Sequence, residues 1–176
     1  MKLCNENSIR AMIESGELRI ESEHNDIIFL DDFRLGLRLL DQASFAEGTA
    51  DLSKANESPL STFSLSQEGL GAGQFALGKS AEKISLPSHI LGFMNTRSKY
   101  ARLGLELLQS SWLAAPGFGN GHPTPIVFEM QARRRITGFS QSEPYAFLML
   151  FALDEPLRLD GRMYHMRFPL YVWKEG

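Results

Sequence analysis

The sequence predicts an all-β protein, a barrel or a sandwich, preceded by a short N-terminal helix. Apolar and polar residues alternate strictly over residues 33–39, which is typical of a strand with one buried face. Short apolar runs recur along the rest of the chain, at 75–77, 90–94, 103–108, 126–130, 147–153 and 166–173. Turn-forming glycines and prolines separate these runs, as in 68–73 and 116–121. Many short strands divided by such turns indicate an all-β barrel or sandwich.

The helix is the first element that the sequence predicts. Asn7 or Ser8 can cap its N-terminus, and Gly16 is suited to end it. The apolar residues that would share its buried face are Ile9, Met12 and Ile13.

The elements after the helix are predicted as strands at the apolar runs. Segment 103–109 is rich in Leu and Glu and allows a helix, but the strand is favoured because the neighbouring segments need sheet partners. Two polar segments, 53–62 and 119–125, are predicted as loops.

Length and composition predict one globular domain over residues 1–176. The chain has 176 residues, of which 43% are hydrophobic and 22% charged. A net charge of −3 gives no overall positive field, so we expect no nucleic-acid partner. No apolar run approaches the roughly 18 residues of a membrane span and no secretory signal is visible, so we expect a cytoplasmic protein without a membrane partner.

Cysteine and histidine usage argues against a metal held by side chains. The single cysteine, Cys4, excludes every zinc site that needs two thiolates, so no zinc is expected. The four histidines lack the spacing of metal ligands. They are His24, His89, His122 and His165.

The densest group of polar residues beside an apolar run is segment 95–104. It contains the cations Arg97, Lys99 and Arg102 and the hydroxyl of Ser98. Arginine can bind phosphate through two parallel hydrogen bonds, and lysine can bind it as a point charge. A solvated basic turn is the alternative interpretation, and the segment alone does not decide between them.

Three further features are candidates for a site. Glu129 lies inside the apolar run 126–130, where a buried carboxylate must be paired or protonated. Strand alternation equally allows Glu129 to face solvent. The turn at 116–118 can bring an aromatic ring and backbone to a small ligand, whereas the basic run 133–135 is predicted to be a solvated turn.

In order, these segments resemble the dCTP deaminase branch of the dUTPase-like superfamily, over roughly residues 1–157. Residues 97–105 (Arg-Ser-Lys-Tyr-Ala-Arg-Leu-Gly-Leu) are similar to the family signature Arg-Ser-Ser-x-Ala-Arg-x-Gly, and we call them the signature segment. Residues 32–36 resemble its Asp-x-Arg-Leu-Gly strand, and 51–53 follow where a similar tripeptide occurs. Residues 116–118 and 126–129 resemble its Pro-Gly turn and the strand that carries the catalytic Glu.

The resemblance implies a distorted β-barrel of the β-clip, dUTPase-like kind, assembled as a homotrimer with active sites between subunits. The implied activity is zinc-independent hydrolytic deamination of dCTP, or a related deoxycytidine nucleotide, to dUTP and ammonia. Mg²⁺ would enter with the substrate triphosphate.

The resemblance also assigns roles to residues of this chain. Glu129 would be the general base that activates water, Ser98 would hold that water, and Arg102 would orient the cytosine. Arg97 and Lys99 would bind the phosphates. The other residues placed at the substrate are Tyr100, Ala101, Ala115, Phe118, Val127 and Phe128.

Several positions depart from the family pattern. Lys99 stands in place of the second Ser of the signature, and Ala115 in place of the Asp that precedes Pro-Gly. Extra residues lie around 122–125, and 164–176 show no counterpart of the C-terminal lid, although their alternation allows a strand on a neighbouring chain. A catalytically silent nucleotide-binding or regulatory homologue and a dUTP pyrophosphatase are therefore the alternatives.

Overall fold

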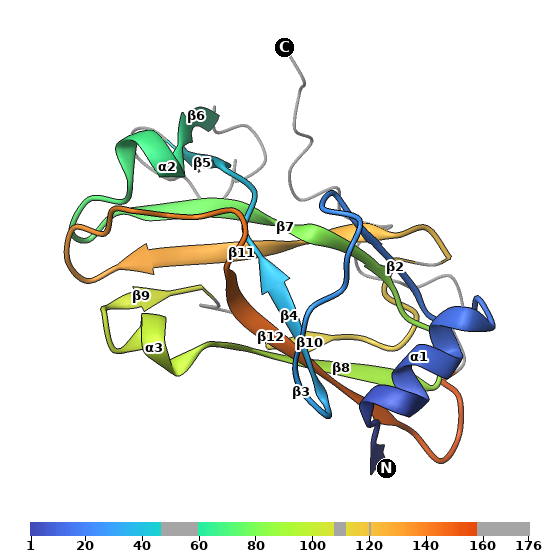
Figure 1. Cartoon of the computed structure of the whole chain (residues 1–176). Coiled ribbons are helices and arrows are strands. Elements are labelled where there is room, and N and C mark those ends of the chain that lie inside the picture. Colours follow the sequence, from blue (N-terminus) through green and yellow to red (C-terminus); the bar gives the residue numbers. More distant parts are fainter. Residues whose placement is uncertain (47–59, 108–111, 120, 158–176) are drawn as a thin grey trace.

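The computed structural model describes residues 1–46, 60–107, 112–119 and 121–157, which form two six-stranded sheets around one core (Figure 1). The all-β prediction is confirmed. The first sheet has the order β10-β8-β12-β4-β3, with β1 paired to β12. Its strands are β1 (Lys2–Leu3), β3 (Phe29–Asp31), β4 (Arg34–Arg38), β8 (Ile90–Thr96), β10 (Leu113–Ala114) and β12 (Pro144–Ala152).

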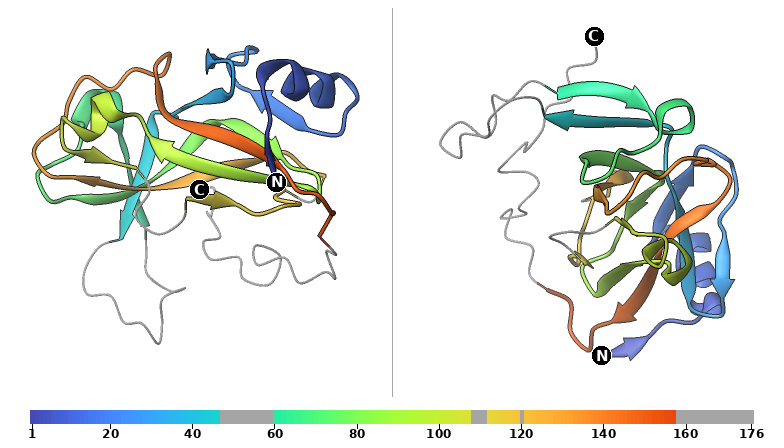
Figure 2. Two further views of the ribbon diagram at one scale, coloured as in Figure 1. Left: turned by 90° about the horizontal axis from the view of Figure 1, so that it is seen from below. Right: turned by 90° about the vertical axis from the view of Figure 1, so that its left-hand side faces the viewer.

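The second sheet has the order β6-β5-β7-β11-β9, with β2 paired to β7. Its strands are β2 (Arg19–Ser22), β5 (Gln42–Ala46), β6 (Leu60–Ser64), β7 (Phe75–Ser85), β9 (Leu105–Glu106) and β11 (Thr124–Ala132). Every strand pair in both sheets is antiparallel. Figure 2 shows from two further directions that β5 and β6 form the outer edge of this sheet.

Three short helices complete the described part of the chain: α1 (Glu6–Glu14), α2 (Leu65–Glu68) and α3 (Ser98–Ala101). In Figures 1 and 2, α1 and α3 lie at opposite ends of the molecule. None of these described helices has the length and apolar character needed to cross a membrane.

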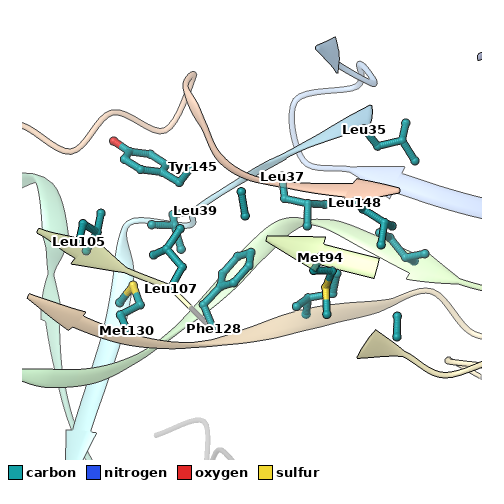
Figure 3. Packing of buried hydrophobic residues seen from close by; sticks show 14 of the residues in the cluster. Leu35, Leu37, Leu39, Met94, Leu105, Leu107, Phe128, Met130, Tyr145 and Leu148 are labelled. Carbon is teal, nitrogen blue, oxygen red and sulfur yellow. The ribbon is translucent and has the colours of Figure 1, made fainter. Parts of the chain in front are cut away.

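The core lies between the two sheets. Phe128 and Met130 of β11 are fully buried and face Leu37 of β4 and Leu148 of β12 across it (Figure 3). Removing apolar surface of this kind from water is the main stabilising contribution to folding, at about 25 cal/mol per Å². The core fixes which face of β11 points outward, because successive side chains of a strand point to opposite sides.

The short N-terminal helix is confirmed, but its predicted cap is wrong. Asn5 is the N-cap, and its side-chain oxygen accepts a hydrogen bond from the Ser8 backbone N–H at 3.0 Å. Three potential capping residues occur close together here, and the choice among them follows from where Ile9 must sit to be buried. Gly16 follows the helix with a φ of 76°, as expected for a glycine that ends a helix.

The strand predicted at 33–39 is confirmed as β4, but the prediction that one face meets solvent is wrong. Leu35 and Leu37 point into the core, and Gly36 and Arg38 on the other face are buried as well. A Cβ at Gly36 would lie 2.9 Å from the Pro144 side chain, which shows how closely the second face is covered.

Several other boundaries differ from those predicted from sequence. β7 is 11 residues long, whereas the apolar run predicted only 75–77. The favoured strand at 103–109 is present as the two residues of β9, and Thr124 and Pro125 of the predicted loop belong to β11. Residues 60–62 of the other predicted loop lie in β6. Segments 51–53, 166–173 and the C-terminal stretch 164–176 lie outside the described residues.

Candidate active site

The signature segment begins where β8 ends and turns directly into α3. The Arg97 backbone N–H donates to the Tyr145 carbonyl of β12 at 2.9 Å. This hydrogen bond continues the pairing of β8 with β12 by one residue. The Arg102 N–H then donates to the Ser98 carbonyl at 3.0 Å and closes a single helical turn. Gly104, with a φ of 88°, ends this turn, and the chain returns as β9.

A cleft of about 450 Å³ lies beside the first half of this turn; we call it the α3 cleft. Its walls combine cations, hydroxyls and an amide with two apolar side chains. The lining residues are Leu30, Arg34, Asn95, Thr96, Arg97, Ser98, Lys99 and Phe147. Ser98 is exposed in this cleft, so its hydroxyl can meet a ligand.

Each of the three cations of the α3 cleft is held by an acceptor of the same chain. The Arg34 Nε donates to Asp31 at 2.7 Å, and its guanidinium lies 5.1 Å from the centre of the Phe147 ring. An Arg97 terminal nitrogen donates to the Pro144 carbonyl at 3.0 Å. These contacts orient the charged groups while leaving further N–H groups of both guanidinium ions available to a ligand.

Lys99 is held by Glu143, which immediately precedes β12. The Lys99 Nζ lies 2.7 Å from the Glu143 Oε2, and the Tyr100 hydroxyl donates to the same oxygen at 3.2 Å. Hydrogen bonds from Lys99 and Tyr100 lower the pKa of Glu143, and the hydrogen bond to Glu143 raises the pKa of Lys99. Both groups are therefore charged at neutral pH.

Tyr100 is itself fixed by an aromatic cluster. Its ring stacks on Tyr145 with centroids 4.4 Å apart, and the centroid of the Phe139 ring lies 5.7 Å from that of Tyr145. Burial raises the pKa of Tyr145, whose hydroxyl oxygen accepts the Ser140 backbone N–H at 2.7 Å. The cluster places Tyr100 against the loop that carries Glu143.

The second half of the signature segment contacts the basic run 133–135. Ala101 and Arg102 are exposed, and the backbone that follows them packs on the basic run 133–135. The Arg134 Nε donates to the Leu103 carbonyl at 2.9 Å, and the Arg133 N–H donates to the Gly104 carbonyl at 2.8 Å. The prediction that residues 133–135 are exposed is confirmed, although two of them support the turn.

Glu129 lies on the other sheet, on the outward face of β11. It pairs with Leu77 of β7 and is half-buried, between the exposed Val127 and the half-buried Gln131 on the same face. Of the two interpretations left open by the sequence, the structure supports an outward-facing carboxylate. Phe128 is fully buried in the core, so only its backbone can contact a ligand.

The register of β9 separates Glu129 from Arg102 within one chain. Leu105 pairs with Ala132, and because the strands are antiparallel, Arg102 and Glu129 extend in opposite directions from this pair. Ala132 and Glu129 are three positions apart along β11, which corresponds to about 10 Å. Glu129 is not among the described residues that line the α3 cleft.

The Pro-Gly turn lies at the far end of β8. The Phe118 N–H donates to the Ala115 carbonyl at 2.9 Å, and the Phe118 carbonyl accepts the Leu86 N–H at 2.8 Å. Ala115 is exposed, and Phe118 packs partly on the core. Because β8 has seven residues, this turn lies about 20 Å from α3 in the same chain.

One chain therefore brings Arg97, Ser98 and Lys99 to one cleft and holds the other predicted site residues elsewhere. Sequence reasoning assigned no role to Arg34 or Glu143. Arg34 belongs to the Asp-x-Arg-Leu-Gly resemblance, which was a usable signal. No sequence pattern indicated a role for Glu143, because it is 44 residues from Lys99 in sequence and only the fold brings the two together.

The described residues contain no group of three His, Cys, Asp or Glu side chains placed to hold a metal ion. The three charged side chains that line the α3 cleft are all cations. Such side chains suit the binding of phosphate oxygens and do not suit the binding of a metal ion.

A protein-family model described as dCTP deaminase-like matches residues 3–137. The chain belongs to this family. The matched range runs from Leu3 in β1 to beyond β11, and it includes the signature segment, the Pro-Gly turn and Glu129. It ends before Glu143 and β12, so the loop that holds Lys99 lies outside the matched part.

Curated relatives agree with this membership. A dCTP deaminase of Marinomonas sp. is 30% identical over 135 residues, which are 69% of each chain. A dCTP deaminase described as dUMP-forming, from Aquifex aeolicus, is 31% identical over 133 residues, 74% of this chain and 72% of the relative.

Solved structures share the fold. A 2′-deoxycytidine 5′-triphosphate deaminase from Agrobacterium tumefaciens superposes with a TM-score of 0.57 at 22% identity, over 85% of this chain and 48% of that one. This chain thus spans about half the length of that structure. A dUTPase of Staphylococcus bacteriophage 80alpha has a TM-score of 0.51 at 10% identity, over 80% of this chain and 93% of the other. The dUTPase-like fold that the resemblance implied is confirmed.

Proposed function

We propose that this protein deaminates dCTP, or a related deoxycytidine nucleotide, by hydrolysis. The observation that carries the proposal is the α3 cleft, which joins the Ser98 hydroxyl to Arg34, Arg97 and Lys99 in a member of the dCTP deaminase-like family. Three cations around a cleft of nucleotide size suit a phosphate chain. Membership in the dCTP deaminase-like family rests on the family model and on the curated relatives.

In the proposed reaction, Glu129 takes a proton from water as the oxygen attacks C4 of cytosine. That proton passes to the leaving amino group, the C4–N4 bond breaks and ammonia leaves. The proton of the new C4 hydroxyl moves to N3 of the ring, which gives the uracil nucleotide as the other product. Ser98 holds the water and Arg102 orients the base. Arg97 and Lys99 bind the phosphates, and Mg²⁺ enters as part of the substrate, bound to its phosphate oxygens.

We further propose that the site is completed between copies of this chain, in a homotrimer. The outward face of β11 carries Glu129 away from the α3 cleft, so a neighbouring copy has to bring the two together. Exposed apolar side chains support contact between copies, because a monomer seldom leaves many of them in water. They include Leu103, Trp112, Leu113 and Val127, each between 43% and 59% exposed.

The proposed reaction has two possible outcomes for the phosphate chain: it stays intact, or it is cleaved as well. The Aquifex aeolicus relative is described as dUMP-forming, whereas the Marinomonas relative is described only as a dCTP deaminase. The first would release pyrophosphate together with ammonia, and the second ammonia alone. A silent nucleotide-binding homologue would release neither.

The test is a panel of dCMP, dCDP, dCTP and dUTP with Mg²⁺, in which ammonia and pyrophosphate are measured in parallel. We expect ammonia from dCTP. Glu129→Gln should lower the rate by about 10²- to 10⁴-fold, the usual contribution of a general base. Glu21→Gln is the matched control, because Glu21 is an exposed carboxylate on β2 of the same sheet. Nucleotide binding without ammonia release from the wild type would contradict the proposal.

A further inference from the structure

We propose that Glu143 is an electrostatic gate on the α3 cleft, which competes with substrate phosphate for Lys99 and weakens the binding of nucleotides with long phosphate chains most. The inference rests on the proposed function in one respect: the phosphates lie at the α3 cleft. It concerns a residue outside the part of the chain that matches the family model.

The first argument is the position of the Glu143 carboxylate. Its Oε2 lies 2.7 Å from the Lys99 Nζ, where a phosphate oxygen would lie if Lys99 bound substrate. Lys99 also lies 4.7 Å from the centre of the Tyr100 ring, so its ammonium is directed to the Glu143 side. A phosphate can therefore reach Lys99 only by displacing this carboxylate or by binding next to it.

The second argument is that Glu143 is held in place and ionised. The Tyr100 hydroxyl donates to the same carboxylate oxygen at 3.2 Å, and Tyr100 is fixed by its stack on Tyr145. Because Lys99 and Tyr100 lower the pKa of Glu143, it carries a full negative charge at neutral pH. A fixed charge of this kind repels an approaching anion.

The third argument is that the Lys99–Glu143 pair can be exchanged. The two side chains are 51% and 49% exposed, and exposed ion pairs contribute little to stability. Water reaches both groups, so separating them leaves no unsolvated charge. The pair is therefore a competitor for ligand and not a lock on the fold.

The fourth argument is the charge balance of the cleft. Arg34, Arg97 and Lys99 bring three positive charges, and the paired carboxylates of Asp31 and Glu143 bring two negative ones, which leaves a net charge of +1. Neutralising Glu143 alone makes the net charge +2. Because a Coulomb energy scales with the charge of the ligand, triphosphates should gain more from this change than monophosphates.

The test uses binding of inorganic phosphate and inorganic tripolyphosphate, measured by calorimetry at low ionic strength on the full chain. Glu143→Gln should bind tripolyphosphate about three- to fivefold more tightly than the wild type does. For inorganic phosphate the gain should be less than twofold. Glu143→Asp, which keeps the charge, should stay near the wild-type affinity.

A control variant separates the gate from general effects. Glu106→Gln removes a carboxylate that pairs with Arg133 near the same end of the molecule, and it should not produce the gain. An unchanged or weaker tripolyphosphate affinity in Glu143→Gln, or an equal gain in Glu106→Gln, would overturn the proposal.

These outcomes are independent of catalysis, because the probes contain no cytosine. Failure of the proposed function appears as absence of ammonia release in the nucleotide panel. Failure of the gate appears as unchanged selectivity between phosphate and tripolyphosphate, whether or not dCTP is deaminated.

Discussion

Two clusters of charged residues in this protein are built from the same chemistry and differ in their access to water. The first joins Arg38 of β4 to Glu82 of β7 and to Asp26. The second joins Lys99 of α3 to Glu143. Each connects segments of the chain that are far apart in sequence. Each also borders a cleft: Asp26 lines one of about 440 Å³, and Lys99 lines the α3 cleft.

The centre of the Arg38 cluster, the pair of Arg38 and Glu82, is buried, whereas Asp26 at its edge is half-exposed. The side chains of Arg38 and Glu82 are both 3% exposed, and Glu82 accepts from the Arg38 Nε and from the Arg38 backbone N–H, each at 2.7 Å. The remaining terminal nitrogens of Arg38 donate to Asp26 and to the Ser22 hydroxyl, also at 2.7 Å. Removing Arg38 or Glu82 leaves a buried charge without its main partner, so this pair cannot be exchanged for a ligand.

The Lys99 cluster is half-exposed, and water replaces each partner that is lost. Burial, more than hydrogen-bond length, therefore decides what an ion pair does. Two pairs with the same 2.7 Å contact serve as a fixed internal support in one case and as an adjustable charge in the other.

The largest effect is expected for Arg38→Met. The substitution leaves Glu82 buried without its cation, and loss of one partner from a buried pair costs about 3–5 kcal/mol. For a chain of this size such a loss lowers the melting temperature by about 10 °C. Thermal and urea unfolding measure it.

Arg133→Met is the control for this prediction, because it breaks an ion pair whose arginine is 74% exposed. It should change the stability by less than about 1 kcal/mol. If Arg38→Met and Arg133→Met were equally stable, the buried pair would contribute no more to stability than the exposed one, and the prediction would be wrong.

A smaller effect is expected from acid. The folded state lowers the pKa values of Asp31 and Glu143 through their hydrogen bonds to Arg34 and Lys99. Their contribution to stability is therefore fully present above the unfolded pKa values, at about 4, and is lost as the pH falls through the lower folded values. The urea midpoints of the wild type and Glu143→Gln should differ slightly at pH 7 and converge towards pH 3. A difference that grows on acidification would contradict this assignment.

The smallest effect on stability is expected for Lys99→Met. Because the pair is exposed, the free energy of unfolding of this variant should differ from that of the wild type by less than about 1 kcal/mol. The same variant should bind tripolyphosphate more weakly, since the cleft loses a cation. A loss of stability as large as that of Arg38→Met would show that Lys99 is part of the framework.

The sequence predicted the elements whose signal is local. The alternation at 33–39 indicated β4, and the apolar runs at 90–94 and 126–130 indicated β8 and β11. It did not predict that β7 extends to Ser85, because Lys79, Glu82 and Lys83 interrupt the apolar pattern. Partners from other strands cover polar residues of this strand, as Arg38 covers Glu82, and such cover is a property of the assembled sheets.

For the site, the sequence indicated the residue types but not their pairing. The signature segment pointed to the cluster at Arg97, Ser98 and Lys99, and the α3 cleft holds all three. Glu143 was missed, because its role depends on a contact between two segments 44 residues apart. The roles of Glu129, Arg102, Ala115 and Phe118 stay predictions, since one chain places them away from the cleft.

The central claim is that one chain supplies the α3 cleft and another supplies Glu129. The most direct measurement is ammonia release from dCTP by a protein in which Ser98→Ala and Glu129→Gln chains are co-expressed in equal amounts. Each variant alone should be nearly inactive. The co-expressed protein as a whole should recover about a quarter of the wild-type rate, because after random assembly one site in four joins an intact Ser98 to an intact Glu129 of its neighbour. If the mixture stayed as inactive as the separate variants while the wild type deaminated dCTP, the site would lie within one chain and the account would be contradicted.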